Sequence, residues 1–462
     1  MKALSVPYIH VPYGKLMPIS RPREALFLFL GDIFFLALAL IVTLIVRYAE
    51  VPDARLLTLH FVPFSFLFLL STLVFFIAGL YEKHTLTMKE ALPATVFYAQ
   101  CANIIIAVAL FFFAPFFAIQ PKAFLFLYLF FSTILVSVWR TTVFPALSVR
   151  EPAPAILLGS GTECEEVYEE VNGNTRYSVR FEAFHRTQGE APAPDDLLKL
   201  ASAHSPSVVV MPASYLRDPA FASAWSTLAR QGVRFISLSD LYEELFERVA
   251  LPLIDGRVFF EKGIFDQTFL YATLKRVMDV ALSTSALILI SPLLLAVWFA
   301  LKAGGGNALI FQERIGQGNR LIRIIKFRTM LFDDAGDPEK QKKNRVTAFG
   351  AFLRKWQIDE MPQFLNVIMG DLSLVGPRPE IPALVAEYEK HIPYYGARHM
   401  IQPGISGWAQ IKHASPPKWK LDVEATRNKL SFDLYYLKHR SIVTDTVVAL
   451  RTLKILAARA GK

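Results

Sequence analysis

Cysteine is almost missing from this chain of 462 residues, which contains only Cys101 and Cys164. The two lie far apart, one in a predicted membrane helix and one in a predicted soluble segment, so neither a disulfide nor a cysteine-bound metal is indicated. Charge is also scarce, because Asp, Glu, Lys and Arg make up 19% of the residues whereas 53% are hydrophobic. This composition is too apolar for an ordinary soluble protein and predicts a membrane protein of roughly two to four domains.

Two further absences narrow the function. The sequence has no aromatic–basic motif of the kind that binds nucleic acid. The net charge of +9 is therefore expected to face an anionic lipid leaflet, and no nucleic acid is expected as a partner. A cleavable signal peptide is not expected either, because the first apolar run is too long for a signal h-region and lacks a convincing small-residue cleavage site.

The N-terminal part of the chain contains long apolar runs with few charged residues. A polar tail at 1–24 comes first, and four apolar runs follow it. Each run is near the roughly 20 residues that a helix needs to span a bilayer, so the region 25–145 is predicted to form a four-helix transmembrane bundle. The runs lie at about 25–46, 61–80, 95–117 and 123–139.

Asp32 is the exception inside these runs, which otherwise carry almost no charge. An acid within a membrane span is a candidate functional group, but near a helix end it could equally be solvated. An even number of spans returns the chain to the side on which it started. The basic tail, together with Arg140 and Arg150, predicts that this side is the cytoplasm.

From about 151 to 250 the composition becomes that of a globular domain. Short apolar runs alternate with helical stretches, which predicts a parallel α/β sheet. The first strand leads into Gly159-Ser160-Gly161, but Cys164 stands at the third glycine position of a dinucleotide fingerprint. A structural or regulatory domain is therefore favoured over a nucleotide-binding one. The predicted strands lie at 155–159, 179–184, 207–211 and 233–237, and the helices at 162–172, 195–203 and 218–231.

A fifth apolar run, at 277–301, follows a linker at 251–272. Its length alone would predict another span, but basic residues flank it at both ends, which places both ends on one side. Pro292 cannot donate to the carbonyl of Ile288 and should kink the helix, while Ser291 could satisfy a freed backbone group. We predict a re-entrant hairpin of helix, break and helix, with a plain fifth span as the alternative.

The densest group of reactive residues lies at 353–380. Asp359 and Glu360 are adjacent, and Arg378 stands in a stiff Gly-Pro-Arg-Pro turn. An Asp-Glu pair alone would be interpreted as a solvated surface pair. With fixed cations nearby, the group suits a phosphate ester held with a divalent metal. One carboxylate can attack phosphorus, another can hold Mg²⁺, and arginine can neutralise phosphate oxygens.

Three motifs in this half of the chain closely resemble a known family. They are Asp-Glu-x-Pro-Gln at 359–363, Gly-Asp-x-Ser-x-Val-Gly-Pro-Arg-Pro at 370–379 and Pro-Gly-Ile-Ser-Gly-Trp-Ala-Gln at 403–410. The sequence resembles the bacterial sugar transferases, which are polyprenyl-phosphate hexose-1-phosphate transferases, from about residue 273 to the C-terminus. Met361 and Gln402 replace the more usual leucine and basic residue, and neither touches a proposed catalytic group.

The resemblance implies a fold, a reaction and a location. The expected fold has a Rossmann-like regulatory domain in the cytoplasm at 151–250 and a mainly α-helical monotopic catalytic domain at 273–462. The expected reaction transfers hexose-1-phosphate from a UDP-sugar to undecaprenyl phosphate and releases UMP. It would occur at the cytoplasmic face of the bacterial inner membrane and begin an exopolysaccharide, a capsule or an O-antigen.

The resemblance also implies roles for residues. Asp359 would be the nucleophile that forms a covalent phospho-sugar intermediate, and Glu360 would be the Mg²⁺ ligand. UDP-glucose and UDP-galactose are the expected donors. The candidates for binding or orienting the substrates are Arg378, Lys326, Arg328, Arg354, Gln363, Asn366 and Asp371.

Two other functions stay open at this stage. One is a metal-dependent glycosyltransferase that moves sugar without its phosphate and releases UDP. The other is a non-catalytic membrane scaffold of a polysaccharide assembly complex. The bundle and the α/β domain both offer surfaces for a homodimer, which the sequence leaves open. The basic amphipathic helix at 443–460 suits either the membrane interface or packing on the catalytic domain.

Overall fold

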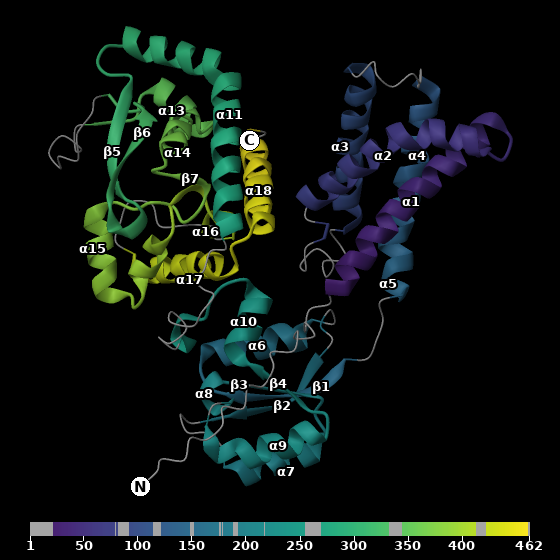
Figure 1. The fold of residues 1–462 in the computed structure, drawn as a ribbon, viewed down its shortest axis with the longest axis vertical. Helices are drawn as coiled ribbons and strands as arrows, with labels where there is room; N and C mark the ends of the chain where they lie inside the picture. Colours follow the sequence, from purple (N-terminus) through teal and green to yellow (C-terminus); the bar gives the residue numbers. More distant parts are fainter. Residues whose placement is uncertain are drawn as a thin grey trace. The chain divides into compact units, whose positions relative to one another are not determined.

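The computed structural model divides the chain into two compact units, Met1–Leu245 and Phe246–Lys462 (Figure 1). The first unit contains an apolar helix bundle and an α/β domain, and the second contains the candidate active site. Most of the predicted tail at 1–24 and of the predicted linker at 251–272 lies outside the described residues. The structure describes residues 22–78, 80–81, 92–113, 122–147, 152–174, 177, 179–187, 193–216, 218–254, 269–331, 344–412 and 422–460.

The apolar runs of the N-terminal half form helices. Three segments of this region, Leu26–Tyr48, Ala54–Ile77 and Phe124–Val143, are long and apolar enough to cross a membrane, as is Phe269–Ala303 in the second unit. The apolar stretch described in the third helix, Ala99–Val108, is shorter. These segments support the prediction of a membrane protein. The elements are α1 (Pro22–Tyr48), α2 (Ala54–Ile77), α3 (Leu92–Phe113), α4 (Lys122–Val138), the π-helical turn η1 (Trp139–Val143) and α5 (Phe144–Leu147).

Helix α2 begins at Ala54, earlier than the predicted start at 61. The side chain of Asp53 accepts a hydrogen bond from the backbone N–H of Leu56 at 2.7 Å. This contact caps the helix by satisfying one of the amide groups that its first turn leaves without a partner. Residues 54–60, which precede the predicted run at 61–80, are therefore helical.

Asp32 and Arg140 form a buried ion pair inside the bundle. Two nitrogens of Arg140 contact the two carboxylate oxygens of Asp32 at 2.9 and 2.5 Å, and Tyr81 donates to the same carboxylate at 2.6 Å. Arg140 also donates to the carbonyl of Leu80 at 3.1 Å. The interpretation of Asp32 as a solvated group is thus wrong. The use of Arg140 as a surface charge at the membrane flank is also wrong, because the π-helical turn carries this side chain inward.

The α/β domain is built on a four-stranded sheet. Its elements are β1 (Ala153–Gly159), α6 (Thr162–Gly173), β2 (Val179–Arg186), α7 (Pro194–His204), β3 (Val208–Met211), α8 (Ala213–Leu216), η2 (Pro219–Phe221), α9 (Ala222–Arg230), β4 (Arg234–Ser237) and α10 (Leu238–Phe246). The strand order is β2-β1-β3-β4, and each neighbouring pair is parallel. Helices α6 and α10 cover one face of the sheet and α7 and α9 the other (Figure 1). The prediction of a parallel α/β sheet is confirmed.

The second unit is mainly helical, with two small sheets: β5 and β6 pair in antiparallel fashion, and β7 and β8 in parallel. Its elements are η3 (Leu251–Leu253), α11 (Phe269–Ala303), β5 (Leu309–Ile315), η5 (Gln317–Asn319), β6 (Leu321–Phe327), α13 (Ala348–Lys355), η6 (Ile358–Glu360), α14 (Gln363–Met369), β7 (Ser373–Val375), α15 (Pro382–His391), η7 (Tyr395–Met400), β8 (Gly404–Ser406), α16 (Trp408–Lys412), α17 (Val423–His439) and α18 (Ile442–Ala460).

Two apolar cores hold this unit together. One joins the end of α11 to β6 and α13 through residues such as Leu301, Phe327 and Leu353. The other contains Trp408 and, from α18, the fully buried Val448. Helix α18 therefore packs on the rest of the second unit, which supports one of the two predicted roles of the segment 443–460.

Helix α11 is bent. Figure 1 shows it as two helical arms that meet at a sharp bend, and Pro292 lies inside the helix. The hydroxyl of Ser291 donates to the carbonyl of Ile288 at 2.8 Å, so it satisfies the group that Pro292 cannot reach. Apolar side chains next to this point face outward, and Leu289 is 81% exposed. The kink and its chemical cause agree with the sequence, while the re-entrant position in a membrane stays a prediction.

Candidate active site

The adjacent carboxylates Asp359 and Glu360 lie on η6, a short 3-10 turn between α13 and α14. The chain enters this turn through Gln357, whose φ of 55° lies in the left-handed region that residues with a Cβ rarely adopt. Strained backbone of this kind often accompanies functional groups, because the surrounding fold must hold it in place. Both carboxylates are half-buried.

Glu360 is held by two cations. The Lys326 ammonium contacts its Oε1 atom at 2.7 Å. The Arg378 guanidinium contacts Oε1 at 2.6 Å and Oε2 at 3.3 Å. Burial by itself would raise the pKa of Glu360, but the charges of Arg378 and Lys326 outweigh it and hold this pKa at about 2. Glu360 is therefore ionised throughout the physiological range.

The pKa of Asp359, unlike that of Glu360, is raised. Burial, followed by the negative charge of Glu360, raises the pKa of Asp359 to about 6, and the charges of Lys326 and Arg354 only partly oppose this. Within the described part of the chain, no other side chain donates a hydrogen bond to this carboxylate. The pair therefore combines one firmly ionised, anchored carboxylate with one that titrates near neutrality.

The turn that carries Arg378 is built on direct backbone contact between two loops. The amide of Gly376 donates to the carbonyl of Ser406 at 2.8 Å, and the amide of Gly404 donates to the carbonyl of Pro377 at 2.9 Å. A Cβ atom added to Gly404 would overlap the backbone of Gly376, and one added to Gly407 would overlap the same residue. The second and third motifs of the sequence are thus two sides of one structure, the paired strands β7 and β8 with the loops that follow them.

A buried charge network supports the far side of this turn. Arg398 donates to the carbonyl of Arg378 at 2.9 Å and contacts Asp433 at 2.7 Å. Its other terminal nitrogen, Nη1, donates to the Tyr395 hydroxyl at 2.9 Å and lies 3.6 Å from Glu380, whose carboxylate also pairs with Lys429. The side chain of Arg398 is 1% exposed. This guanidinium therefore fixes the backbone of Arg378 rather than binding substrate.

Two other predicted binding residues have mainly structural contacts. Asn366 is fully buried: it accepts from the backbone of Ile325 at 3.0 Å, donates to the backbone of Arg323 at 2.8 Å and donates to Asp371 at 3.2 Å. Asn366 therefore ties α14 to β6, and Asp371 belongs to the same tie.

The remaining candidates are more dispersed. Arg328 does not join Lys326 at Glu360; it donates to the carbonyl of Leu301, in the last turn of α11, at 3.3 Å and to that of Gly305, just after the helix, at 2.5 Å. Arg354 is exposed, donates to the Thr329 hydroxyl at 2.9 Å and influences Asp359 by its charge. Gln363 is buried in the first turn of α14.

The roles of three groups at this site were not predicted from the sequence. The cation Arg398 lies outside the 353–380 stretch. Its acidic partner Asp433 is the first residue of Asp-Leu-Tyr-Tyr-Leu at 433–437, a stretch that resembles another motif of the same family, but a supporting role for Asp433 was not expected. Lys275 and Arg276, near the start of α11, were interpreted only as charges that flank a membrane segment. An exposed aromatic stripe, formed by Phe349 and Phe352 on α13 and by Trp356 at its C-cap, was also missed. Its spacing of three and then four residues is typical of one helix face and could have been found.

The carboxylates available for a metal are few. In the described parts of the chain, no three His, Cys, Asp or Glu side chains gather as a metal-binding group. Mg²⁺ bound with phosphorylated substrates usually takes one or two protein carboxylates and completes its coordination with phosphate oxygens and water. Asp359 and Glu360 meet that number, although both oxygens of Glu360 already accept from cations. These residues therefore fit Mg²⁺ when a diphosphate supplies further oxygens.

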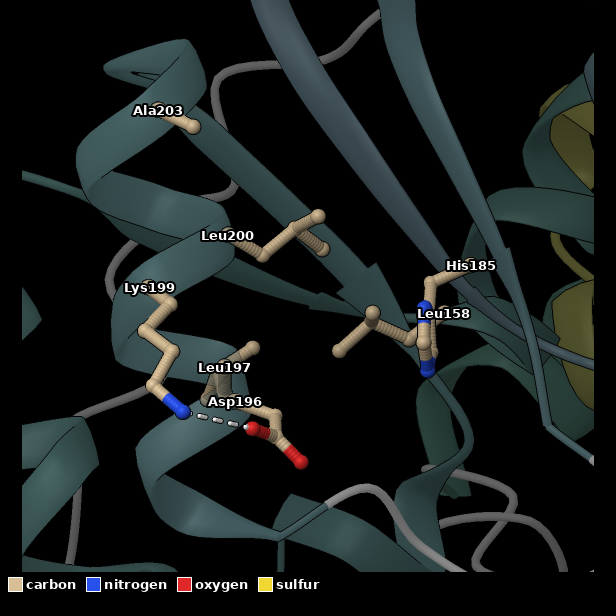
Figure 2. Close-up of a pocket in the computed structure, with 7 residues that line it drawn as sticks. All are labelled: Leu158, His185, Asp196, Leu197, Lys199, Leu200 and Ala203. Atoms are coloured by element: carbon tan, nitrogen blue, oxygen red, sulfur yellow. Dashed lines mark hydrogen bonds and ion pairs between the residues drawn. The ribbon is translucent and has the colours of Figure 1, made fainter.

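A hollow of about 300 Å³ lies in the α/β domain. Figure 2 shows Leu158 and His185 on one side of it and the α7 residues Leu197 and Leu200 on the other. Lys199 also lines it and is paired with Asp196 at 3.2 Å. The lining is mainly apolar, which does not suit a diphosphate.

The glycine turn after β1 is equally unsuited to a dinucleotide. Glu163 and Glu165 occupy the first turn of α6, where their negative charge opposes a phosphate. The Cys164 sulfur lies so close to Gly159 that a Cβ added there would contact it at 2.7 Å. These contacts favour the structural or regulatory interpretation of the domain.

The fold and the site define a membrane protein with a paired-carboxylate site whose cations are held by a buried framework. A match to the family described as bacterial sugar transferase covers residues 270–459. The UDP-glucose:undecaprenyl-phosphate glucose-1-phosphate transferase of Caulobacter vibrioides is 39% identical over 186 residues, which are 39% of this chain and 69% of that protein. The exopolysaccharide production protein PSS of Rhizobium leguminosarum is 36% identical over 188 residues, 39% of this chain and 93% of that protein. The chain belongs to the bacterial sugar transferase family.

A longer alignment exists with a relative from Aeromonas hydrophila. This UDP-N-acetylgalactosamine-undecaprenyl-phosphate N-acetylgalactosaminephosphotransferase is 36% identical over 254 residues, 53% of this chain. The match spans 58% of that relative, and about 39% of the length of an Escherichia coli UDP-glucose:undecaprenyl-phosphate glucose-1-phosphate transferase.

Proposed function

We propose that this chain transfers a hexose-1-phosphate from a UDP-sugar to undecaprenyl phosphate and releases UMP. One observation carries the proposal. Asp359, which has a reactive carboxylate with a pKa near 6, lies beside Glu360, which Lys326 and Arg378 hold in place. Family membership supports this reaction class, because three of the relatives described above are named as undecaprenyl-phosphate sugar-phosphate transferases.

The first proposed step is an exchange of phosphoryl linkages. A carboxylate oxygen of Asp359 attacks the β-phosphorus of the UDP-sugar. The bond between that phosphorus and the oxygen that bridges to the α-phosphorus breaks, and UMP leaves with the electron pair. The product is a sugar-phosphoryl aspartate. Because one phosphoryl linkage replaces another, this step is expected to be nearly reversible.

The second proposed step regenerates the enzyme. A phosphate oxygen of undecaprenyl phosphate attacks the same phosphorus, the bond to Asp359 breaks, and polyprenyl diphosphate-sugar is released. Arg378 is suited to follow the charge through both steps, because its side chain is 38% exposed and can turn from Glu360 to phosphate oxygens. The prolines on either side restrict its backbone, so that reorientation is confined to the side chain.

Mg²⁺ is the proposed cofactor. Glu360 would hold it, and the ion would neutralise the diphosphate as charge develops on the leaving UMP. The residues themselves supply the rest: Lys326 anchors Glu360, and Arg378 and Arg354 add positive charge near the reacting phosphorus. Glu360→Gln should lose Mg²⁺-dependent activity, and full activity of the unmodified chain in EDTA would exclude the metal role.

The bent helix α11 and the aromatic stripe on α13 support a site at a lipid surface. A polyprenyl phosphate keeps its chain in the bilayer and its phosphate at the boundary with water. We propose that α11 is re-entrant, and that the site faces the cytoplasm at the bacterial inner membrane, where UDP-sugars are available. The proposed role in the cell is the first membrane step of an exopolysaccharide, a capsule or an O-antigen.

Nucleotide release tests the proposed function. The purified full-length chain is incubated with a short-chain polyprenyl phosphate, Mg²⁺ and one UDP-sugar at a time: UDP-glucose, UDP-galactose or UDP-N-acetylgalactosamine. UMP together with polyprenyl diphosphate-sugar is the expected product from one of them. UDP in place of UMP would establish a glycosyltransferase, and no nucleotide release from a broad set of UDP-sugars would favour the non-catalytic scaffold.

A further inference from the structure

Helix α11 is bonded directly to the backbone on which the candidate active site is built. The Lys275 ammonium donates to the carbonyl of Val375 at 3.0 Å, and the Asp279 carboxylate accepts from the amide of Leu374 at 3.2 Å. Both contacts are on β7, immediately before the turn that carries Arg378. The first arm of the apolar helix is therefore attached to this turn by charged groups rather than by apolar packing alone.

The same arm of α11 also contacts α14, the helix that follows Asp359 and Glu360. Arg276 donates to the carbonyls of Val367 and Ile368 at 2.7 and 2.8 Å. These are among the last carbonyls of α14, the helix that follows Asp359 and Glu360, and carbonyls at a helix end lack partners within the helix. Cations at such an end are favourable, so this contact stabilises α14 as well as locating it.

Lys275 is supported by a buried polar cluster. It contacts Asp445 of α18 at 2.8 Å, and the two side chains are only 15% and 7% exposed. Tyr436 donates to Asp445 at 2.6 Å and lies 3.3 Å from the same Val375 carbonyl. Burying an ion pair costs solvation, which only good geometry and further hydrogen bonds offset. Here Lys275 donates to the carbonyl of Val375, and the Tyr436 hydroxyl, which donates to Asp445, lies beside the same carbonyl.

A displacement of the Val375 backbone should move the backbone of Arg378 by a similar amount. Gly376 is packed against the backbone of the neighbouring loop, and Pro377 has a fixed φ. On the other side, Arg398 fixes the carbonyl of Arg378 itself. The segment between these two anchors has little freedom to absorb a displacement.

We propose that Lys275 is a positioning residue for Arg378, through which the membrane helix α11 sets the place of this guanidinium at the donor phosphates. The proposal rests on the proposed transferase function. It differs from a purely structural role, in which the ion pair of Lys275 and Asp445 would stabilise the fold without affecting any one reacting group.

A double-mutant cycle separates the two roles. UMP release is measured in the full-length chain for the unmodified protein, Lys275→Met, Arg378→Ala and the double variant. If Lys275 acts through Arg378, Lys275→Met should lower kcat/KM by about tenfold in the unmodified background and by less than about twofold when Arg378 is already absent, since residues that work as a unit are not additive. Independent effects that multiply in the double variant would overturn the proposal.

Three further variants keep the test interpretable. Lys275→Arg retains the charge and should recover most of the activity. Tyr436→Phe removes one hydroxyl from the same cluster and provides a milder change if Lys275→Met does not fold; its effect should also shrink without Arg378. Lys390→Met removes an exposed lysine paired with Glu387 and should leave the rate unchanged. If the unmodified chain releases no UMP from any UDP-sugar, the proposed function fails and the positioning role falls with it.

Discussion

The bundle and the candidate active site each contain an arginine–carboxylate pair, and the two pairs differ in their access to water. In the bundle, the side chains of Arg140 and Asp32 are 1% and 0% exposed. At the site, Arg378 is 38% exposed and its partner Glu360 is 18% exposed. A sealed pair cannot exchange its partner without leaving a charge uncompensated, whereas the partly open pair can pass its cation to a phosphate. The buried pair in the bundle is suited to stabilising the fold, and the partly exposed pair at the site is suited to binding a phosphate.

The largest effect should come from a change that leaves both pairs intact. Asp359→Asn keeps the size of the side chain but removes the attacking oxygen's charge. UMP release should fall by at least about a thousandfold, as expected for loss of a nucleophile. Protein incubated with labelled UDP-sugar should also carry no sugar-phosphate adduct by mass spectrometry. A variant that still forms the adduct would exclude Asp359 as the nucleophile, and Glu387→Gln, on an exposed helix face, serves as the control.

Breaking the sealed pair should affect stability more than chemistry. Arg140→Ala leaves Asp32 charged and buried, which typically costs about 3–5 kcal/mol in the free energy of unfolding. A lower midpoint of thermal unfolding in detergent is the expected result. Replacing both residues by apolar ones, Asp32→Leu with Arg140→Met, should restore most of the loss. An unchanged midpoint in Arg140→Ala would mean that this pair has no architectural role.

Breaking the open pair should have the reverse outcome. Arg378→Ala removes a donor that would stabilise charge on the transferring phosphate, and kcat/KM should fall by about a hundredfold. Its unfolding midpoint should change less than that of Arg140→Ala, because solvent reaches the Arg378 site. Arg427→Ala, which breaks an exposed pair with Glu424, should leave the rate within about twofold. A loss of stability as large as in the bundle would contradict the distinction between the two pairs.

The smallest effect concerns pH. With a pKa of about 6, Asp359 is protonated and unreactive below that pH, so kcat/KM should fall about tenfold per pH unit on the acid side and level off above it. Arg354 lowers the pKa of Asp359 through its charge. Arg354→Gln should therefore move the acid limb to higher pH, and a limb that stays in place would show that another group titrates. A pH–rate profile at saturating Mg²⁺ measures both.

Local sequence predicted the features that depend on neighbouring residues. The alternation of apolar runs predicted the parallel sheet around β1, and Pro292 with Ser291 predicted the break in α11 because its cause lies within four residues. The adjacency of Asp359 and Glu360 needed no folding argument. Lys326, one of the predicted binding residues, contacts Glu360, and its role toward substrate stays a prediction.

Features that depend on distant partners could not be predicted from the sequence. Asp32 meets Arg140 only because two helices pack, and the carbonyl of Arg378 meets Arg398 across a folded loop. Asn366 was a candidate for binding or orienting the substrates, but its side chain forms hydrogen bonds with the backbone of β6. A single sequence shows which side chains can donate or accept hydrogen bonds. The fold decides which of them remain available to bind substrate.

The contact between Gly376, Gly404 and Gly407 also limits how the enzyme can be redesigned. Two loops that touch through bare backbone tolerate neither a methyl group nor an inserted residue, so mutagenesis for a new sugar should leave both loops untouched. Diversity libraries would be better placed on surrounding segments, where a new side chain can be accommodated without separating β7 from β8.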